Sequence, residues 1–265
     1  MSKSKIYFCL FLLLVSFVYL YTKLSSFNLY EIVSNQDIVT VVSSNSPIKL
    51  DSTVFKEDNR KRNNLLEKPI VYFYNTHQTE EYKSSKNYKP TVVTASKVLE
   101  KTLKNKGILS LVEKRSIKKK LDEYGYDYSG TYAVSFEYLK DSKKKNPSLK
   151  YFFDVHRDSI VGKDSRVNIN GKNYATMMFL VGQNHKNYKK NVKNIKMMGN
   201  YLNKHYQGLL RDTYYQPKYS YNQEYDENMF LVEIGGPNNT LEEITNTSIA
   251  LGDAISNYVE VNNEK

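Results

Sequence analysis

Three segments of the sequence place ionisable side chains at or near the end of an apolar run. His77, Glu80 and Glu81 follow the first run, His156 ends the second, and Glu233 lies within the third. Imidazole and carboxylate groups are common ligands of a catalytic zinc ion, and a carboxylate can also move a proton during hydrolysis. These side-chain types therefore indicate a hydrolytic metal site. The segments are VYFYNTHQTEEY (71–82), DVHRDS (154–159) and LVEIGG (231–236).

The chemistry of such a site predicts a role for each residue. Two imidazoles and one carboxylate, from His77, His156 and Glu80, would hold zinc and leave its fourth position for water. Zinc lowers the pKa of that water to about 7 and polarises a carbonyl group. Glu233 would take the proton of the water and give it to the leaving group.

Neighbouring charged residues would support these groups. Asp154 or Asp158 would orient His156, because a metal-bound histidine commonly donates its second ring N–H to a carboxylate. Arg157 would hold a carboxylate of the substrate or balance the charge of the site. Glu233 is notable because it lies inside an apolar run, where a buried carboxylate is costly without a partner.

Alternating strands and helices would bring the three segments together. Repeated strand–helix units predict an α/β fold with a mostly parallel mixed sheet flanked by helices. In such sheets the functional site lies beyond the carboxyl ends of the strands. Asn170 and Gly171 separate two strand-like runs and predict a hairpin, and Thr240 with Glu243 forms a capping-box pattern. The expected strands are 69–76, 108–113, 149–156 and 227–236, the hairpin lies within 167–182, and the expected helices are 94–107, 129–147, 188–206 and 240–260.

The N-terminal part of the chain has the pattern of a membrane anchor. Lysines precede an uncharged apolar run at 6–21, and no small-residue cleavage motif follows it. We expect residues 1–22 to form an uncleaved signal anchor in the cell membrane, with the rest of the chain on the extracytoplasmic side. A cleaved signal peptide is the alternative. Residues 23–67 lack sustained periodicity and predict a spacer, which is followed by one domain at 68–260.

The composition limits the classes of site and partner. Cys9 is the only cysteine and lies in the apolar run, so the exported part can form no disulfide and no cysteine-ligated metal site. The net charge of +11 would suit nucleic acid in a cytosolic protein. Outside the membrane the available polyanions are teichoic acids, anionic lipid headgroups and wall peptides, so we expect no nucleic-acid partner. A solvated, lysine-rich surface is the alternative explanation of the charge.

Taken in order, the motifs look like those of one known family. The resemblance is to the stage II sporulation protein P family, which is itself similar to zinc-dependent N-acetylmuramoyl-L-alanine amidases of the amidase-3 type. It extends over roughly 68–258, and the predicted anchor and spacer also fit that family. The segments that carry it are VYFYNTHQTEEY (71–82), FDVHRDS (153–159), FLVGQN (179–184) and NQEYDENMFLVEIGGPNNTLEE (222–243).

The resemblance implies a membrane-anchored peptidoglycan hydrolase. Such an enzyme would cut the amide bond between N-acetylmuramic acid and the L-alanine of the stem peptide. It implies Zn²⁺ as cofactor, with His77, Glu80 and His156 as ligands and Glu233 as the catalytic acid and base. The adjacent Glu81 stays open as an alternative ligand.

The resemblance also implies a setting and partners. Asn222 and Gln223 match the residues before the last strand in the family and would line the substrate groove. The family works at the septal membrane during engulfment in sporulation, together with another wall hydrolase, a lytic transglycosylase, and a membrane scaffold. The residues leave open whether cross-links in peptidoglycan are cut as well.

Two other functions compete with an amidase. A catalytically inactive wall-binding or scaffold protein would use the basic, tyrosine-rich surface without chemistry. A glycosidase would use two carboxylates about 5–9.5 Å apart, but His77 and His156 would then have no role. Dependence on a metal ion separates the amidase from both alternatives.

Overall fold

The computed structural model describes residues 68–263. The predicted anchor at 1–22 and the spacer at 23–67 lie outside these residues. Between residues 68 and 263, no helix is both long and apolar enough to cross a membrane.

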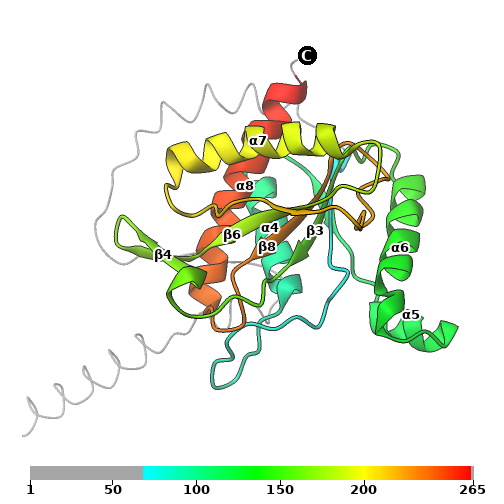
Figure 1. Ribbon diagram of the computed structural model, residues 1–265, viewed down its shortest axis with the longest axis horizontal. Coiled ribbons are helices and arrows are strands. Elements are labelled where there is room, and N and C mark those ends of the chain that lie inside the picture. The colour runs from blue at the N-terminus through cyan, green and yellow to red at the C-terminus, as the bar shows by residue number, and fades with distance from the viewer. Residues whose placement is uncertain (1–67, 264–265) are drawn as a thin grey trace, which may run out of the picture. The chain divides into compact units, whose positions relative to one another are not determined.

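A six-stranded sheet forms the centre of the fold (Figure 1). Its strands are β1 (Val71–Tyr74), β2 (Ser110–Val112), β3 (Tyr151–His156), β6 (Met177–Gly182), β7 (Tyr214–Gln216) and β8 (Met229–Ile234). They lie in the order β2-β1-β3-β8-β6-β7, and within this sheet one pair, β6 with β8, is antiparallel. The sheet is therefore mixed and mostly parallel, as predicted, and β1, β3 and β8 are parallel neighbours.

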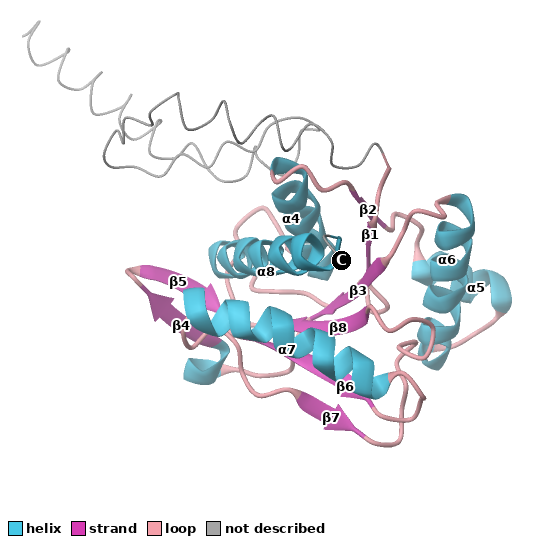
Figure 2. Cartoon of the chain, turned by 90° about the horizontal axis from the view of Figure 1, so that it is seen from above, coloured by secondary structure: helices cyan, strands magenta, loops and turns pink. Residues whose placement is uncertain are grey.

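Helices cover both faces of this sheet. The helices are α4 (Val92–Asn105), α5 (Ile117–Tyr124), α6 (Thr131–Lys145), α7 (Tyr188–His205) and α8 (Leu241–Asn263). The first face carries α4, α7 and α8, and the second carries α6 with α5 beside it (Figure 2). Phe73 of β1 packs in the core of the first face, whereas Tyr72 and Tyr74 pack with Leu139 of α6. Because both faces are buried, the central strands read as continuous apolar runs.

Two local predictions are confirmed by the backbone. Asn170 and Gly171 join the hairpin strands and have φ angles of 51° and 81°, as a tight hairpin turn of this sequence requires. At the start of α8, the Thr240 N–H donates to the Glu243 carboxylate, and the Glu243 N–H donates to the Thr240 hydroxyl. The hairpin strands are β4 (Arg166–Ile169) and β5 (Lys172–Ala175), which form a separate two-stranded sheet.

Two elements of the fold were missed by the sequence reasoning. Helix α5 lies in a lysine-rich stretch and buries only Ile117 and Leu121, so its apolar stripe is too narrow to stand out. Strand β7 is three residues long and its tyrosine side chains are exposed. Each element pairs or packs through contacts with distant parts of the chain, which a local pattern does not contain.

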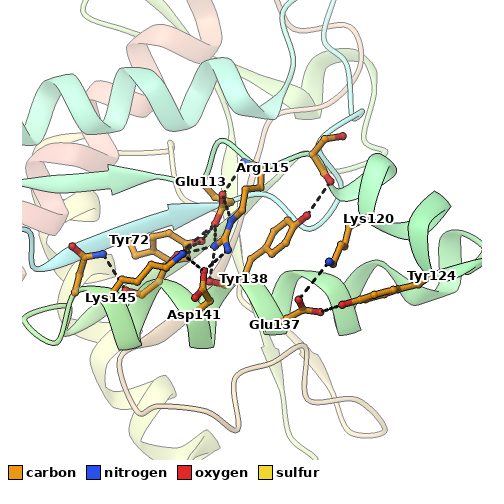
Figure 3. A network of polar contacts seen from close by, with 12 residues as sticks. Tyr72, Glu113, Arg115, Lys120, Tyr124, Glu137, Tyr138, Asp141 and Lys145 are labelled. Atoms are coloured by element: carbon orange, nitrogen blue, oxygen red, sulfur yellow. Dashed lines mark hydrogen bonds and ion pairs between the residues drawn. The ribbon is translucent and has the colours of Figure 1, made fainter.

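A polar network joins α6 to the end of β2 (Figure 3). The guanidinium of Arg115, which follows β2, pairs with Glu113 at 2.6 Å and with Asp141 of α6 at 2.5 Å. It also donates to the carbonyl oxygen of Tyr138. The hydroxyl of Tyr72 on β1 donates to Glu113 from the sheet side. The network therefore fixes α6 to the sheet through one arginine.

Gln78 connects the loop after β1 to the start of α5. Its side-chain amide donates to the carbonyl oxygen of Arg115 at 2.8 Å and accepts the N–H of Ile117 at 2.9 Å. This loop carries the first ionisable segment. The position of α5 and α6 is therefore tied to the residue next to His77.

Candidate metal centre

The carboxyl ends of β1, β3 and β8 bring together the predicted metal-binding residues. Nδ1 of His77 lies 3.4 Å from Oε1 of Glu80, and Nδ1 of His156 lies 3.5 Å from Oε2 of the same carboxylate. One ligand atom from each of the three residues lies within 4.8 Å of the others. Glu233 is the register partner of His156 on the neighbouring strand. The four residues thus occupy one edge of the sheet.

The loop after β1 positions Glu80 in preference to Glu81. The Glu80 N–H donates to the carbonyl oxygen of His77 at 3.0 Å, which closes a turn. Oε2 of Glu80 accepts the N–H of Arg157 at 2.9 Å, and this bond joins the loop to the end of β3. The Glu81 carboxylate pairs with Lys89 at 2.6 Å and is 42% exposed. The geometry therefore favours Glu80 as the ligand.

Asp154 lies beside the ring of His156. Its Oδ1 is 3.0 Å from Nε2 of His156. The same carboxylate accepts the N–H of Thr76 at 2.9 Å and its hydroxyl at 2.6 Å, so its position is fixed from two directions. Because Nε2 faces Asp154, Nδ1 is the nitrogen that faces Glu80. Asp158, the other predicted partner, instead pairs with Arg211 at 2.6 Å.

The carboxylates give the centre a strong preference for positive charge. Burial opposes ionisation of Glu80, but hydrogen bonds from His156 and His77 outweigh it and lower its pKa to about 2. Burial also opposes protonation of His156, yet the charges of Asp154 and Glu80 raise its pKa well above the usual value. Two nitrogens and a carboxylate oxygen on well-braced strand ends fit a zinc ion in ligand type and number.

Glu233 has the opposite electrostatic environment. Burial raises its pKa to about 7, and the charges of Glu80 and Asp158 add to this effect while His156 opposes it. Its buried Oε2 has no hydrogen-bond partner among the described residues. A carboxyl group that titrates near neutral pH can both accept and return a proton.

Arg157 braces the loop that carries Glu80. Its Nε donates to the carbonyl oxygen of Glu81 at 2.8 Å, and its Nη1 donates to that of Asp158 at 3.1 Å. The bond to Glu81 holds the loop after β1 against the end of β3, and the bond to the adjacent Asp158 keeps the guanidinium in position. Contact between Arg157 and a substrate carboxylate stays a prediction.

Asn222 and Gln223 are buried, at 7% and 1% exposure, and both side chains have protein partners. The Asn222 amide donates to the carbonyl oxygen of Tyr132 at 3.2 Å. The Gln223 side chain accepts the N–H of Gly182 and donates to the carbonyl oxygen of Leu180, so it bridges β6. The structure shows them as anchors of the loop before β8, and their contact with a substrate groove stays a prediction.

Two tyrosines beside the centre were not singled out from the sequence. The ring of Tyr128 stacks on that of His77 with centroids 5.0 Å apart, and Tyr132 contacts the edge of the same ring at 5.6 Å. The segment YDYSGTY (126–132) contains both residues. The 24 tyrosines of the chain hide this signal, because no local pattern separates these two from the rest.

A comparison with known protein families identifies the family of this chain. Residues 19–256 match the family described as Stage II sporulation protein P. The chain belongs to this family. The stage II sporulation protein P of Bacillus subtilis (strain 168) is 31% identical over 204 residues, which cover 72% of this chain and 51% of that protein. The chain therefore spans about half the length of this curated relative.

Solved amidase structures show a partial backbone similarity to this member of the stage II sporulation protein P family. The CwlD amidase from Clostridioides difficile, in complex with the GerS lipoprotein, has a TM-score of 0.48 and 13% identity, covering 72% of this chain and 99% of that one. The N-acetylmuramoyl-L-alanine amidase AmiC2 of Nostoc punctiforme has a TM-score of 0.43 and 9% identity, covering 74% and 98%. Residue roles in this chain therefore rest on the geometry of its own centre.

Proposed function

We propose that this protein is a zinc-dependent N-acetylmuramoyl-L-alanine amidase. It would cleave the amide bond between N-acetylmuramic acid and the L-alanine of the stem peptide in peptidoglycan. The observation that carries the proposal is the cluster of His77, Glu80 and His156 beside the buried Glu233. Membership of the stage II sporulation protein P family, whose motifs resemble those of amidase-3 enzymes, supports the choice of substrate.

Each residue of the centre would have one task. His77, Glu80 and His156 would hold the ion, and Asp154 would keep the ring of His156 in place from its Nε2 side. When bound, zinc supplies a Lewis acid that polarises a carbonyl group and lowers the pKa of water. Glu233 would accept a proton from the attacking water and donate it to the amide nitrogen as the carbon–nitrogen bond breaks. Burial raises the pKa of Glu233 above the usual value, which favours a group that first accepts and then returns a proton.

The proposal is tested by hydrolysis of purified peptidoglycan. The full chain, purified in detergent, is incubated with peptidoglycan with and without a chelator, and the products are identified by mass spectrometry. We expect free stem peptides that begin with L-alanine, together with glycan strands that have lost their peptides. Both products disappear on chelation and return when zinc is added.

Other products would contradict the proposal in distinct ways. Cut cross-links with stems still on the glycan would indicate an endopeptidase, and new reducing sugar ends would indicate a glycosidase. If hydrolysis is unchanged by the chelator, the metal site has no role in the reaction. A protein that binds zinc and peptidoglycan but releases nothing would favour the wall-binding alternative.

We also propose that the enzyme acts on the extracytoplasmic side of the cell membrane. The apolar run at 6–21 would anchor it, and 23–67 would connect the anchor to the domain. The name of the Bacillus subtilis relative supports a role in sporulation. From the family resemblance we propose another wall hydrolase and a septal membrane scaffold as partners. Digestion of the domain by protease added to intact protoplasts checks this orientation, and full protection would contradict it.

A further inference from the structure

A row of aromatic rings crosses the candidate metal centre. Tyr128 stacks on His77 at a centroid distance of 5.0 Å, and Tyr132 contacts the edge of the same ring at 5.6 Å. The ring of Tyr132 lies 5.6 Å from that of Tyr221, which in turn lies 5.8 Å from Tyr219. We refer to Tyr128, Tyr132, Tyr221 and Tyr219 as the tyrosine row. It joins the α5–α6 connection to the loop between β7 and β8, with His77 in between.

Folding alone does not account for the two ends of the row. Tyr128 and Tyr219 are 58% and 57% exposed, so neither side chain adds much to the buried core. Tyr132 and Tyr221, between these exposed ends, are part-buried. Exposed aromatic rings that adjoin further rings in this way are a feature of interaction sites more than of ordinary surface. The row is therefore a candidate binding surface directly beside the metal-binding residues.

The loop that carries Tyr219 and Tyr221 is held in a costly conformation. Tyr221 and Asn222 have consecutive φ angles of 53° and 63°, a left-handed backbone that is uncommon for residues other than glycine. Asn222 and the buried Gln223 hold it through their side-chain amides. At Gly182 of β6, a Cβ atom would lie 2.5 Å from the carbonyl oxygen of Tyr219. The buried amides and the close backbone contact therefore hold these two rings in place against the strain of the backbone.

The chemistry of the row suits a sugar better than an acidic peptide. Each tyrosine offers an apolar ring face and a hydroxyl at its tip, which match the C–H face and the hydroxyl groups of a pyranose ring. The row contains no charged side chain. The proposed substrate has two unlike parts, a glycan that is neutral while its lactyl groups are in amide linkage and a stem peptide with free carboxylates. Carboxylates are recognised by arginine or lysine, not by a neutral aromatic surface.

We propose that the tyrosine row binds the glycan strand of peptidoglycan, with sugar rings stacked on its tyrosines. The identity of this ligand rests on the proposed amidase function, whereas the binding itself does not require hydrolysis. Because the row passes over His77, a sugar seated on it lies next to the metal-binding residues. The row would thus place the lactyl amide of that sugar within reach of the centre.

The test measures glycan affinity separately from catalysis. The probe is a peptide-free oligosaccharide of alternating N-acetylglucosamine and N-acetylmuramic acid, with its lactyl groups capped as methylamides. Binding to the full chain in detergent is measured by calorimetry in the presence of a chelator, and free stem peptide is titrated in parallel. We expect Tyr219→Ala to weaken glycan binding about tenfold, which corresponds to the loss of one stacked ring.

Two matched variants distinguish stacking from a general surface effect. Tyr219→Phe retains the ring and keeps glycan affinity close to that of the wild type. Tyr215→Ala removes a tyrosine that is 44% exposed and lies outside the row, and it leaves glycan affinity unchanged. The rings of Tyr132 and Tyr221 lie between Tyr219 and His77. Zinc content is therefore expected to be the same in all three variants.

The outcomes separate this proposal from the proposed function. Glycan affinity that does not depend on Tyr219, an absence of glycan binding, or a loss confined to the stem peptide would each overturn the tyrosine row as a glycan site. If the protein is an active amidase and gives any of these results, the proposed function stands and only the tyrosine-row proposal is rejected. If glycan binding depends on Tyr219 but the protein has no amidase activity, the tyrosine-row proposal stands and the proposed function is rejected.

Discussion

The metal centre and the tyrosine row are neighbours that are positioned by different means. The centre lies at the ends of adjacent parallel strands, where backbone register alone places His156 beside Glu233. The row is formed by two connecting segments, which Arg115, Gln78 and Asn222 hold through side-chain contacts. His156 and Glu233 are thus built on central strands of the sheet, and His77 and Glu80 lie on the loop that directly follows β1. The adjacent surface depends on a few polar side chains and is the easier of the two to disturb.

The largest expected effect comes from removing Glu233, the proposed proton carrier of the centre. Glu233→Gln keeps the shape of the side chain but cannot accept a proton, so kcat should fall by about 10²–10⁴-fold. Zinc content and glycan affinity should be unchanged, because Glu233 is neither a proposed ligand nor part of the row. Hydrolysis assays measure kcat, and metal analysis measures zinc content. Glu224→Gln, at an exposed glutamate, is the matched control, and an active Glu233→Gln enzyme would remove Glu233 from this role.

The second prediction separates two adjacent glutamates at the centre. Glu80→Ala removes a proposed ligand and should weaken zinc binding by more than the roughly 10–100-fold that loss of a supporting partner costs. Glu81→Ala removes only an exposed pair with Lys89 and should have little effect. Competition titration with a chromophoric chelator ranks the two variants. The reverse ranking would move the ligand to the adjacent residue.

A third prediction concerns the partner of His156 in the same centre. Asp154→Asn keeps the size of the side chain but removes its charge from beside Nε2 of His156, so zinc affinity should fall about 10–100-fold. Asp158→Asn is the comparison, since Asp158 pairs with Arg211 and not with the imidazole. Equal losses in the two variants would show that general charge, and not the contact with His156, supports the metal.

A smaller effect is expected when a residue that supports the tyrosine row is removed. Arg115→Ala leaves the buried Glu113 carboxylate without its cation and should lower the free energy of unfolding by about 1–3 kcal/mol. Glycan affinity should fall with it, whereas zinc affinity should stay close to the wild-type value. Lys118→Ala, at an exposed pair, is the control. Denaturant unfolding measures stability, and a loss of zinc binding in Arg115→Ala would show that the two regions are not positioned independently.

The smallest effect is the pH dependence of the same network. Burial opposes ionisation of Glu113, but its hydrogen bonds with Arg115 and Tyr72 outweigh burial, so its folded-state pKa lies below the usual glutamate value of 4.5. The stabilisation is therefore complete above about pH 4.5 and is lost as pH falls through the folded-state pKa. Melting temperatures of the wild type and Glu113→Gln should differ most near neutral pH and converge in acid. A constant difference would exclude this ionisation as the cause.

The sequence was sufficient for the parts of the centre that follow from strand order. The alternation of strands and helices predicts a mostly parallel sheet, and β1, β3 and β8, whose segments carry His77, His156 and Glu233, are parallel neighbours in it. It was not sufficient to separate Glu80 from Glu81, because their difference lies in contacts with Arg157 and Lys89 that are distant in the chain.

The tyrosine row was beyond prediction for a similar physical reason. Its rings meet through tertiary contacts between segments about 90 residues apart, as the bond between Asn222 and Tyr132 shows. Helix α5, which precedes the row, also escaped notice because only two of its residues are buried. Hydrophobic periodicity and helix caps depend on residues that are close in sequence. The contacts that form the tyrosine row and hold α5 join residues that are far apart in sequence.

The lack of a side chain at Gly182 allows the loop that carries Tyr219 and Tyr221 to lie close to β6. Backbone atoms of Tyr219 and Ser220 occupy the space that a methyl group on Gly182 would need, with Ser220 Cα 2.8 Å from the position of that carbon. Any larger residue would push the loop, and the rings of Tyr219 and Tyr221 with it, away from the sheet. The distance between the proposed sugar-binding surface and the candidate metal centre would therefore depend on the absence of one methyl group at Gly182. Substrate fit in this protein would be adjustable at a position that touches neither substrate nor metal.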